Sequence, residues 1–257
     1  MRIAIVGVGS MGNWFAKTLS WEHELAVYDI DEKKAGSVRN AKVLPSVESL
    51  KDFDPDMLLN AVTLSETTKV FDQALPHLSD RCVLCDITSV KGDLPGYYRD
   101  VNRKFVSMHP MFGPTFADMG QLREENVIFI RESDQGAARL FREFFDGLGL
   151  KSFEYTFKEH EEMMAYSLST PFATSMVFAA CVNNTAVPGT TFARHRMLAR
   201  KLLSEDDHLL AEVLFNPYTL GQLEKITGRL EYLKHIIKNR DYEEAQKFFG
   251  KLRENLS

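Results

Sequence analysis

Two patterns of hydrophobic and polar positions alternate along the first 155 residues of the chain. Short runs rich in Val, Ile and Leu are separated by longer segments in which apolar residues recur at helical spacing. Such short runs are typical of strands buried on both faces of a parallel sheet. The pattern predicts strands at 2–6, 24–28, 57–61, 82–86, 105–107 and 127–130, and helices at 13–19, 66–78 and 135–148. This alternation predicts an α/β fold with a Rossmann-type, doubly wound parallel sheet.

The pattern changes after about residue 155, and no convincing strand follows. Met163, Leu168 and Met176 indicate one long apolar helix, and Pro171 inside it is expected to start or kink a helix. Further helices are predicted over 192–203, 206–216, 220–238 and 242–256. We therefore expect a domain of residues 1–155 followed by an all-helical domain of residues 156–257.

The helical half carries more apolar residues than it can bury alone. Segments 163–182 and 209–215 are rich in apolar side chains, in a domain of about 100 residues. Surplus apolar surface of this kind marks contacts between proteins. We expect a homodimer that forms through the helical half, with an interface above the ~2,000 Å² typical of obligate pairs.

The composition of the chain argues against some classes of protein. The chain has 257 residues, 44% of them hydrophobic and 26% charged, and a formal net charge of −5. An acidic chain argues against nucleic-acid binding, which usually needs a basic face. No apolar run reaches the ~18 residues of a membrane span. The first strand begins almost at once, with no basic stretch or cleavage site before it, so we expect a cytoplasmic protein without a signal peptide.

The three cysteines do not form a disulfide framework. Cys82 and Cys85 make a C-x-x-C motif, which is also found in zinc and redox sites. Here they lie in an apolar run, where strand residues three apart point to opposite faces, and no second pair completes a zinc site. We therefore expect structural cysteines, and no metal site is predicted.

A glycine-rich turn follows the first predicted strand and opens a helix. Residues 7–12 read GVGSMG, the G-x-G-x-x-G fingerprint of dinucleotide-binding domains, in the context that this motif requires. Gly7 permits the tight turn, Gly9 lets the backbone approach a pyrophosphate, and Gly12 lets the helix pack close to the strand. The helix N-terminus offers free N–H groups to phosphates. The expected cofactor-binding residues are Gly7, Gly9, Ser10, Met11, Gly12 and Asp29.

Asp29 determines which dinucleotide we expect. It ends the second predicted strand, about 20 residues after the glycines, where an acidic side chain hydrogen-bonds the ribose hydroxyls. A carboxylate there repels a 2′-phosphate, which favours NAD over NADP. The nearby Asp31 is expected to start the next helix instead.

Two polar loops follow predicted strands at the expected crevice. Strand 82–86 leads into a loop that contains Ser89, and strand 105–107 leads into residues 109–114, HPMFGP. Polar residues at the carboxyl ends of parallel strands lie at the ligand crevice. Histidine can accept a proton near neutral pH, and one followed by two prolines and a glycine is not typical of a packed core. We predict that His109 is catalytic.

Three motifs of the chain resemble one family. The GVGSMG turn, the TSVKG loop and above all the HPMFGP segment are similar to the prephenate and arogenate dehydrogenases, the TyrA family. The resemblance covers essentially the whole chain. It implies a homodimer joined through the helical domains. It also implies NAD-dependent oxidative decarboxylation of prephenate to 4-hydroxyphenylpyruvate, a step of tyrosine, and hence aromatic amino acid, biosynthesis.

The resemblance also assigns residue roles. His109 matches the catalytic histidine that hydrogen-bonds the substrate's C4 hydroxyl, and Ser89 matches a serine that helps hold this histidine and the substrate. A family arginine that binds a substrate carboxylate aligns with Lys201, but Arg200 is favoured because a guanidinium binds a carboxylate bidentately. A solvated basic helix face is the alternative for these cations. The expected substrate-binding residues are Arg200, Lys201 and Arg194.

The chain departs from the family pattern in two places. Many members have an acidic residue just after the HPMFGP-like run, where this chain has Thr115. Some members carry a His-Leu-Pro-His run in the first C-terminal helix, and here residues 169–172 read STPF. Roles that depend on that acid or those histidines do not transfer.

The choice between prephenate and arogenate depends on charge. Arogenate carries an ammonium that prephenate lacks. A pocket lined by Arg194, Arg196, Arg200 and Lys201 would favour the more negative prephenate by Coulomb attraction. Asp118 is close enough in sequence to reach the site and could serve the ammonium instead, so arogenate dehydrogenase is the alternative.

Two other classes of protein remain as rivals. One is another Rossmann dehydrogenase of the β-hydroxyacid type, which usually places a catalytic lysine in its helical half and lacks HPMFGP. The other is a nucleotide-sensing binding module without catalysis. The presence of His109 and Ser89 beside an intact dinucleotide turn argues against the second.

Overall fold

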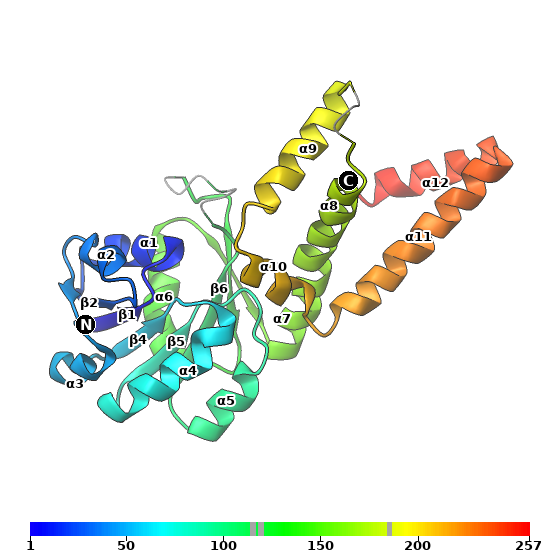
Figure 1. Cartoon of the computed structure of the whole chain (residues 1–257). Coiled ribbons are helices and arrows are strands. Elements are labelled where there is room, and N and C mark those ends of the chain that lie inside the picture. Colours follow the sequence, from blue (N-terminus) through cyan, green and yellow to red (C-terminus); the bar gives the residue numbers. More distant parts are fainter. Residues whose placement is uncertain (114–116, 118–120, 184–186) are drawn as a thin grey trace.

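The sheet and the helices that cover it occupy the N-terminal part of the chain (Figure 1). The computed structural model describes residues 1–113, 117, 121–183 and 187–257. The eight strands lie in the order β3-β2-β1-β4-β5-β6-β7-β8. They are β1 (Arg2–Val6), β2 (Glu24–Tyr28), β3 (Lys42–Val43), β4 (Met57–Asn60), β5 (Val83–Asp86), β6 (Phe105–Pro110), β7 (Asn126–Ile130) and β8 (Lys151–Tyr155).

This topology confirms the expected Rossmann-type fold, with one correction to the strand directions. Strands β1 to β6 pair in parallel, but β7 runs antiparallel to β6, and β8 is parallel to β7. The sheet is therefore mostly rather than entirely parallel. Two strands were not predicted from the sequence pattern: β3, which has only two residues, and β8, whose sequence KSFEY is almost entirely exposed at the sheet edge. Neither has the apolar run by which the other strands were found.

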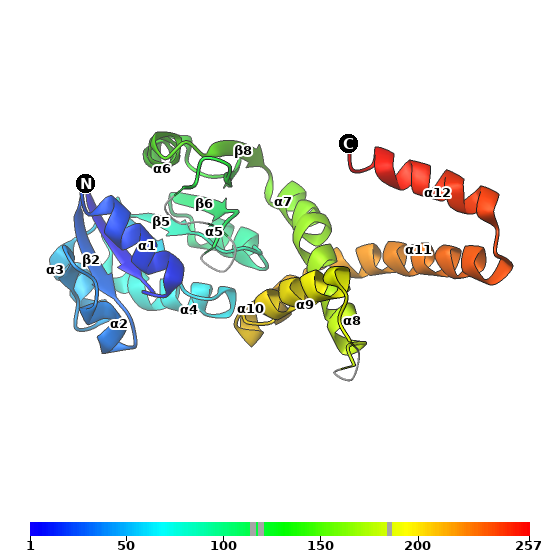
Figure 2. The same cartoon turned by 90° about the horizontal axis from the view of Figure 1, so that it is seen from above.

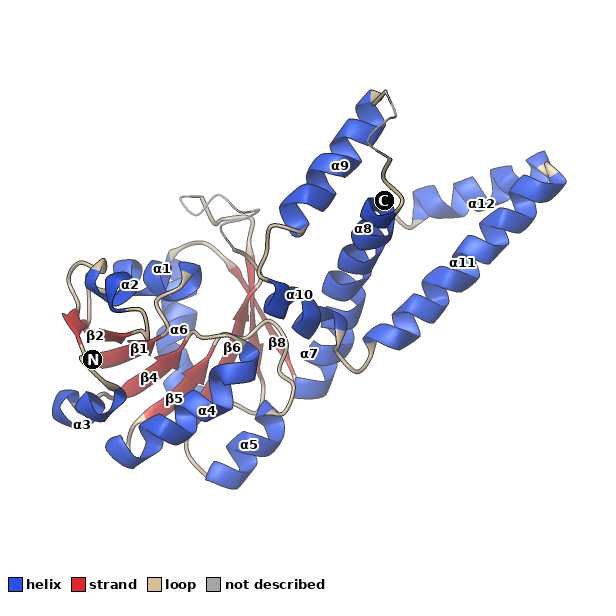
Figure 3. Cartoon of the chain, viewed as in Figure 1, coloured by secondary structure: helices blue, strands red, loops and turns tan. Residues whose placement is uncertain are grey.

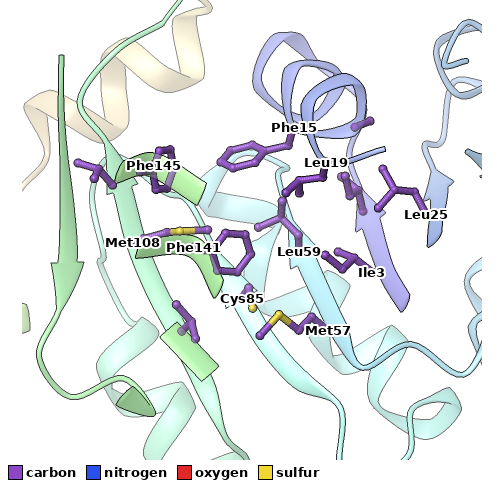
Figure 4. Close-up of a cluster of buried hydrophobic side chains, with 14 of the residues drawn as sticks. Ile3, Phe15, Leu19, Leu25, Met57, Leu59, Cys85, Met108, Phe141 and Phe145 are labelled. Carbon is purple, nitrogen blue, oxygen red and sulfur yellow. The ribbon is translucent and has the colours of Figure 1, made fainter. Parts of the chain in front are cut away.

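Helices cover both faces of the sheet (Figure 3). One apolar cluster joins the sheet to α1 and α6 through Phe15 and Phe141, as Figure 4 shows. A second cluster joins the other face to α3, α4 and α5 through Phe53, Phe71 and Tyr98. These helices are α1 (Ser10–Leu19), α2 (Glu32–Gly36), α3 (Leu50–Phe53), α4 (Leu64–Ala74), α5 (Leu94–Val101) and α6 (Gln135–Gly147), with short 3₁₀ turns at Val47–Ser49 and Leu75–His77.

The two cysteines of the C-x-x-C motif are structural, as predicted. Both are buried and free, and Cys85 belongs to the cluster with α1 and α6 whereas Cys82 belongs to the opposite one. Burial raises the pKa of Cys82 to about 12 and that of Cys85 well above its ordinary value. Neither thiol forms the thiolate that metal binding or redox exchange requires.

Helices form the rest of the described chain. β8 ends at Tyr155 and α7 begins at Phe157, while the division into two domains at this point stays a prediction. Figures 1 and 2 show α11 and α12 projecting away from the sheet. The helices are α7 (Phe157–Met164), a π-helical turn (Ala165–Ser169), α8 (Thr170–Ala180), α9 (Thr190–Leu202), α10 (Asp207–Leu214), α11 (Thr219–Asn239) and α12 (Tyr242–Glu254).

The long apolar helix of the pattern analysis is thus interrupted rather than uniform. Pro171 lies in the first turn of α8, directly after the π-helical turn, where a missing N–H costs least. This confirms that a helix starts at the proline. None of the helices in the described part of the chain is long and apolar enough to cross a membrane.

Candidate active site

The glycine-rich turn has the geometry that the fingerprint predicts. Gly7 has a φ of +88°, and a Cβ there would lie 2.8 Å from the carbonyl carbon of Ala61. A Cβ on Gly12 would collide with the carbonyl oxygen of Gly7. By contrast, nothing lies within 4 Å of a Cβ built on Gly9, so the space beside this residue is open. The turn therefore packs tightly on the protein side and is accessible on the side where a pyrophosphate would lie.

Helix α1 begins directly after this turn without a side-chain cap. Its N-cap residue is Gly9, which has no side chain to accept a hydrogen bond from the first turn of the helix. Ser10 is exposed and Met11 is half-buried. The N–H groups and the positive end of the helix dipole are thus available to a phosphate, which fits a dinucleotide.

The side chain of Asp29 is held against the turn. Its Oδ2 accepts a 2.6 Å hydrogen bond from the Val8 backbone N–H, and its Oδ1 accepts one of 2.8 Å from Asp31 N–H. The carboxylate therefore lies beside the glycines, where the ribose of a dinucleotide would bind. Asp31 caps α2 by accepting from Lys33 and Lys34, as the sequence predicted.

A buried ion pair supports the next loop. Lys91 and Asp86 are both fully buried, and Lys91 Nζ lies 2.7 Å from Asp86 Oδ1. Lys91 Nζ also donates to the Met108 carbonyl oxygen at 2.8 Å, and Tyr98 donates to Asp86 Oδ2 at 2.7 Å. Burial by itself would raise the pKa of Asp86, but the Lys91 charge and the hydrogen bonds lower it. The pair connects the TSVKG loop to β6, one residue before His109.

His109 is a buried residue of β6. This strand continues to Pro110, beyond the predicted end at residue 107, because His109 and Pro110 pair with β7. Nδ1 of His109 lies 3.0 Å from Nε2 of His160, whereas Nε2 has no hydrogen-bond partner among the described residues. Burial, and then repulsion from His160 and Lys91, lowers the pKa of His109 well below 6.5. The imidazole is therefore neutral at pH 7 and can act as a proton acceptor.

The partners of His109 were not predicted from the sequence. His160 is fully buried on α7, and its Nδ1 lies 3.1 Å from Oε1 of Glu161. Lys91 N–H donates to Glu161 Oε1 at 2.7 Å, and Asn216 Nδ2 donates to Oε2 at 3.0 Å. Burial lowers the pKa of His160 to about 3 and raises the pKa of Glu161.

One sequence signal could have found this pair. The buried residues of α7 are Phe157, His160, Glu161 and Met164, which lie on one helix face at spacings of three and four. A histidine and a glutamate at the core positions of an amphipathic helix need buried partners. The sequence alone does not say which partners they find.

An aromatic contact brings the loop after β6 to the dinucleotide turn. Trp14 lies on α1, and its ring centroid is 5.3 Å from that of Phe112 in an edge-on arrangement. Phe112 follows His109 by three residues in the HPMFGP segment. The segment that contains the candidate base therefore packs on the helix that begins at the glycine turn.

Other predicted site residues are less directly connected to His109. Ser89 is half-buried and makes no hydrogen bond with His109 among the described residues. Arg194 and Arg200 on α9 are exposed, and neither forms an ion pair with another described residue. Lys201, at the end of the same helix, is exposed too. The roles expected of these four residues stay predictions.

The two departures from the family pattern have different outcomes. Thr115 and Asp118 lie outside the described residues. In the STPF run, Ser169 is buried, and its hydroxyl donates to the Val213 carbonyl oxygen at 2.8 Å. This serine connects the π-helical turn to α10 and is structural.

A dinucleotide turn, an acidic residue beside it and a buried histidine at the same edge of a Rossmann sheet are features of a nucleotide-dependent dehydrogenase. The family model described as "Prephenate dehydrogenase, nucleotide-binding domain" matches residues 15–151, more than half of the chain. The chain belongs to this family.

Individual relatives agree with the family. A "Probable arogenate/prephenate dehydrogenase" of Methanocaldococcus jannaschii is 23% identical over 97% of this chain and 61% of its own length. A "T-protein" of Enterobacter agglomerans is 28% identical over 64% of this chain and 40% of its own length. The chain thus spans less than two thirds of these two relatives.

A solved structure shares the fold over nearly the whole chain. It is the prephenate dehydrogenase from A. aeolicus in complex with hydroxyphenyl propionate and NAD+. The TM-score is 0.85 and the sequence identity is 19%, and the match covers 99% of this chain and 96% of that one. At this identity the likeness establishes the fold.

Proposed function

We propose that this chain is a prephenate dehydrogenase that converts prephenate and NAD to 4-hydroxyphenylpyruvate, CO₂ and NADH. The observation that carries the proposal is the neutral, buried His109 at the same sheet edge as the glycine turn. Membership of the prephenate dehydrogenase family supports the substrate class.

NAD is the proposed cofactor because the turn fits a dinucleotide and Asp29 fits an unphosphorylated ribose. The open space at Gly9 and the uncapped start of α1 would hold the pyrophosphate. The carboxylate of Asp29 would accept hydrogen bonds from the ribose hydroxyls and repel a 2′-phosphate. When bound, NAD supplies the acceptor for a hydride from C4 of the substrate.

The protein's part in the reaction is to accept a proton and to hold the substrate. As the C4–H bond breaks, the C4 hydroxyl loses its proton to Nε2 of His109 and begins to form a carbonyl. The ring then loses its carboxylate as CO₂ and becomes aromatic. The former carbonyl oxygen, now a phenolate, takes the proton back from His109 and becomes the phenol. Ser89 is proposed to hold His109 and the substrate.

Prephenate is proposed over arogenate on the basis of charge. Arg194, Arg196, Arg200 and Lys201 give α9 a concentrated positive charge. Such a helix attracts the more negative prephenate. Arogenate dehydrogenase is the second candidate, and the double name of the M. jannaschii relative keeps both substrates open.

A homodimer through the helical half is also proposed. Tyr166, Val177, Leu220 and Ile237 are each 59–67% exposed. Val177 lies on α8, and Leu220 and Ile237 lie on α11, and both helices have few buried residues. A second copy that covers these side chains would remove a large apolar area from water. Light scattering at micromolar concentration should give the mass of two chains, and the mass of one chain would refute the dimer.

The test of function is product analysis. The purified chain is incubated with prephenate and NAD, and 4-hydroxyphenylpyruvate and NADH are measured together. We expect the two products in a ratio of one to one. Binding of NAD without turnover of prephenate or arogenate would favour the nucleotide-sensing module. Turnover of a β-hydroxyacid would favour the other dehydrogenase class.

A further inference from the structure

His160 and Glu161 are buried polar groups that the proposed reaction does not yet use. They lie on α7, in the helical half, and contact His109 and the TSVKG loop of the sheet half. Burying two histidines, a glutamate and an amide costs free energy unless all their hydrogen bonds are satisfied. Apolar side chains at these positions would pack α7 against the sheet half without this cost. Packing alone therefore does not explain why the buried groups are polar.

The hydrogen bonds around Glu161 determine which atom is the donor in each contact between Glu161, His160 and His109. The carboxylate accepts from Lys91 N–H at Oε1 and from Asn216 Nδ2 at Oε2, so both oxygens act as acceptors. The contact of 3.1 Å between His160 Nδ1 and Glu161 Oε1 therefore has the histidine as donor. A neutral histidine that carries its proton on Nδ1 has a lone pair on Nε2.

The tautomer of His109 follows from that of His160. Because His160 Nε2 is an acceptor, the 3.0 Å contact between the two rings requires that His109 Nδ1 donates. The proton of the neutral His109 is then on Nδ1, and Nε2 is an unprotonated acceptor. Nε2 of His109 has no hydrogen-bond partner among the described residues, and the proposed reaction needs this nitrogen as a base.

We propose that His160 and Glu161 are positioning residues, which hold His109 in the Nδ1–H tautomer and stabilise the positive charge that it acquires from the substrate. The inference rests on the proposed function. In this proton relay, Nδ1–H of His160 donates to Glu161 Oε1, and Nδ1–H of His109 donates to Nε2 of His160. Nε2 of His109 is left to face the substrate.

Proton transfer is balanced between the substrate and this proton relay. The substrate O–H bond breaks and its proton binds His109 Nε2, which makes His109 a cation. The Nδ1 proton of His109 can then pass to His160 Nε2, so that the charge moves next to the Glu161 carboxylate. Both transfers reverse when the phenolate oxygen left by the loss of CO₂ takes a proton from His109 Nε2. Bound NAD would accept the hydride, and no further oxidant or reductant is needed.

Two other charged groups face the relay. Lys91 opposes protonation of both histidines, and Asp86, which pairs with Lys91, favours protonation of His160. Glu161 is the anion in direct contact with the relay. Removal of its charge should therefore disfavour the protonated pair.

The first experiment reads the tautomer directly and does not depend on catalysis. Histidine ¹⁵N chemical shifts are measured by NMR in the unmutated chain and in His160→Leu. We expect His109 to carry its proton on Nδ1 in the unmutated chain and to lose this preference in His160→Leu. A proton on Nε2 of His109 in the unmutated chain would overturn the inference, whatever the enzyme's substrate.

The second experiment uses kinetics with prephenate and NAD. His160→Leu should lower kcat by about 10²–10⁴-fold, the range for losing a tautomer-fixing or general-base contribution, with KM changed less than about threefold. His160→Gln, whose amide oxygen can accept from His109, should recover part of the loss. Glu162→Gln on the exposed side of α7 is the matched control and should leave kcat unchanged.

The pH profile separates a positioning role from a purely structural one. In Glu161→Gln the acidic limb of kcat/KM should move to lower pH, since the carboxylate no longer favours the protonated pair. A variant that loses activity through misfolding would lose NAD affinity and keep its acidic limb in place. An unmoved limb with normal NAD affinity would contradict the inference. Absence of turnover in the unmutated chain would instead refute the proposed function.

Discussion

Nδ1 of His109 lies 3.0 Å from Nε2 of His160, although the two residues are 51 positions apart in the chain. His109 belongs to β6 of the sheet and His160 belongs to α7 of the helical half. The candidate base is therefore held by a hydrogen bond between the two halves of the protein. Because His160 belongs to the helical half, that half contributes a direct contact to the candidate base.

His109→Asn tests the base itself. The asparagine keeps a polar side chain of similar size but cannot accept a proton at neutral pH. We expect kcat to fall by about 10²–10⁴-fold, while the affinity for NAD and prephenate changes much less. Steady-state kinetics and NAD titration give both numbers. A variant with near-normal kcat would show that His109 is structural.

Asp29→Ser tests the cofactor preference. The substitution removes the carboxylate that accepts from Val8 N–H and that would repel a 2′-phosphate. We expect weaker NAD binding and a smaller ratio between kcat/KM with NAD and with NADP. Asp31→Ser is the control, because Asp31 caps α2. Equal efficiency with both cofactors in the unmutated chain would contradict the role of Asp29.

Lys91→Met tests the ion pair under the site. The substitution leaves Asp86 buried without its cation, and breaking a buried pair in this way costs about 3–5 kcal/mol. Denaturant unfolding should show this loss. Lys69→Met removes a cation from an exposed pair with Glu66 and should change stability little. Equal stability of the two variants would show that the Lys91–Asp86 pair contributes no more than the surface pair.

The histidine pair also predicts how stability depends on pH. The pKa of His109 is well below 6.5 and that of His160 is about 3, so the unfolded chain binds protons between pH 6.5 and 5 that the folded chain does not. The free energy of unfolding should therefore fall as the pH is lowered through this window, by up to about 1.4 kcal/mol per pH unit for each histidine. Urea titrations at several pH values measure the slope. His160→Gln should make it shallower, and a slope that is the same in both proteins would contradict burial of a neutral His160.

Much of the fold was predictable because it depends on local pattern. Six strands have apolar runs, and the predicted helices end within a few residues of the observed ones, except that the long apolar helix is interrupted by a π-helical turn. β8 was not predictable in this way, because its exposed edge position needs no apolar run. The end of β6 was placed too early, since a proline normally ends a strand, and here Pro110 is paired with Val127 of β7.

The candidate site, like the fold, was predictable only where it depends on local sequence. The glycine turn and Asp29 are separated by a fixed spacing that the fold imposes, so the sequence predicted their position. His109 was conspicuous because of the motif around it. His160, Glu161 and Asn216 reach the site only through tertiary packing, across as many as 70 residues, and spacing carries no information about such contacts. The positions of Thr115 and Asp118 lie outside the described residues, so the prediction of substrate preference rests on the basic residues of α9.

The proposed activity of this chain is the oxidation of prephenate with NAD. The most direct measurement is kcat/KM for NADH formation from prephenate and from arogenate, with the same NAD concentration and buffer. We expect NADH from prephenate and a higher kcat/KM for prephenate than for arogenate. A higher value for arogenate would overturn the choice of substrate, and NADH from neither substrate would contradict the proposed function.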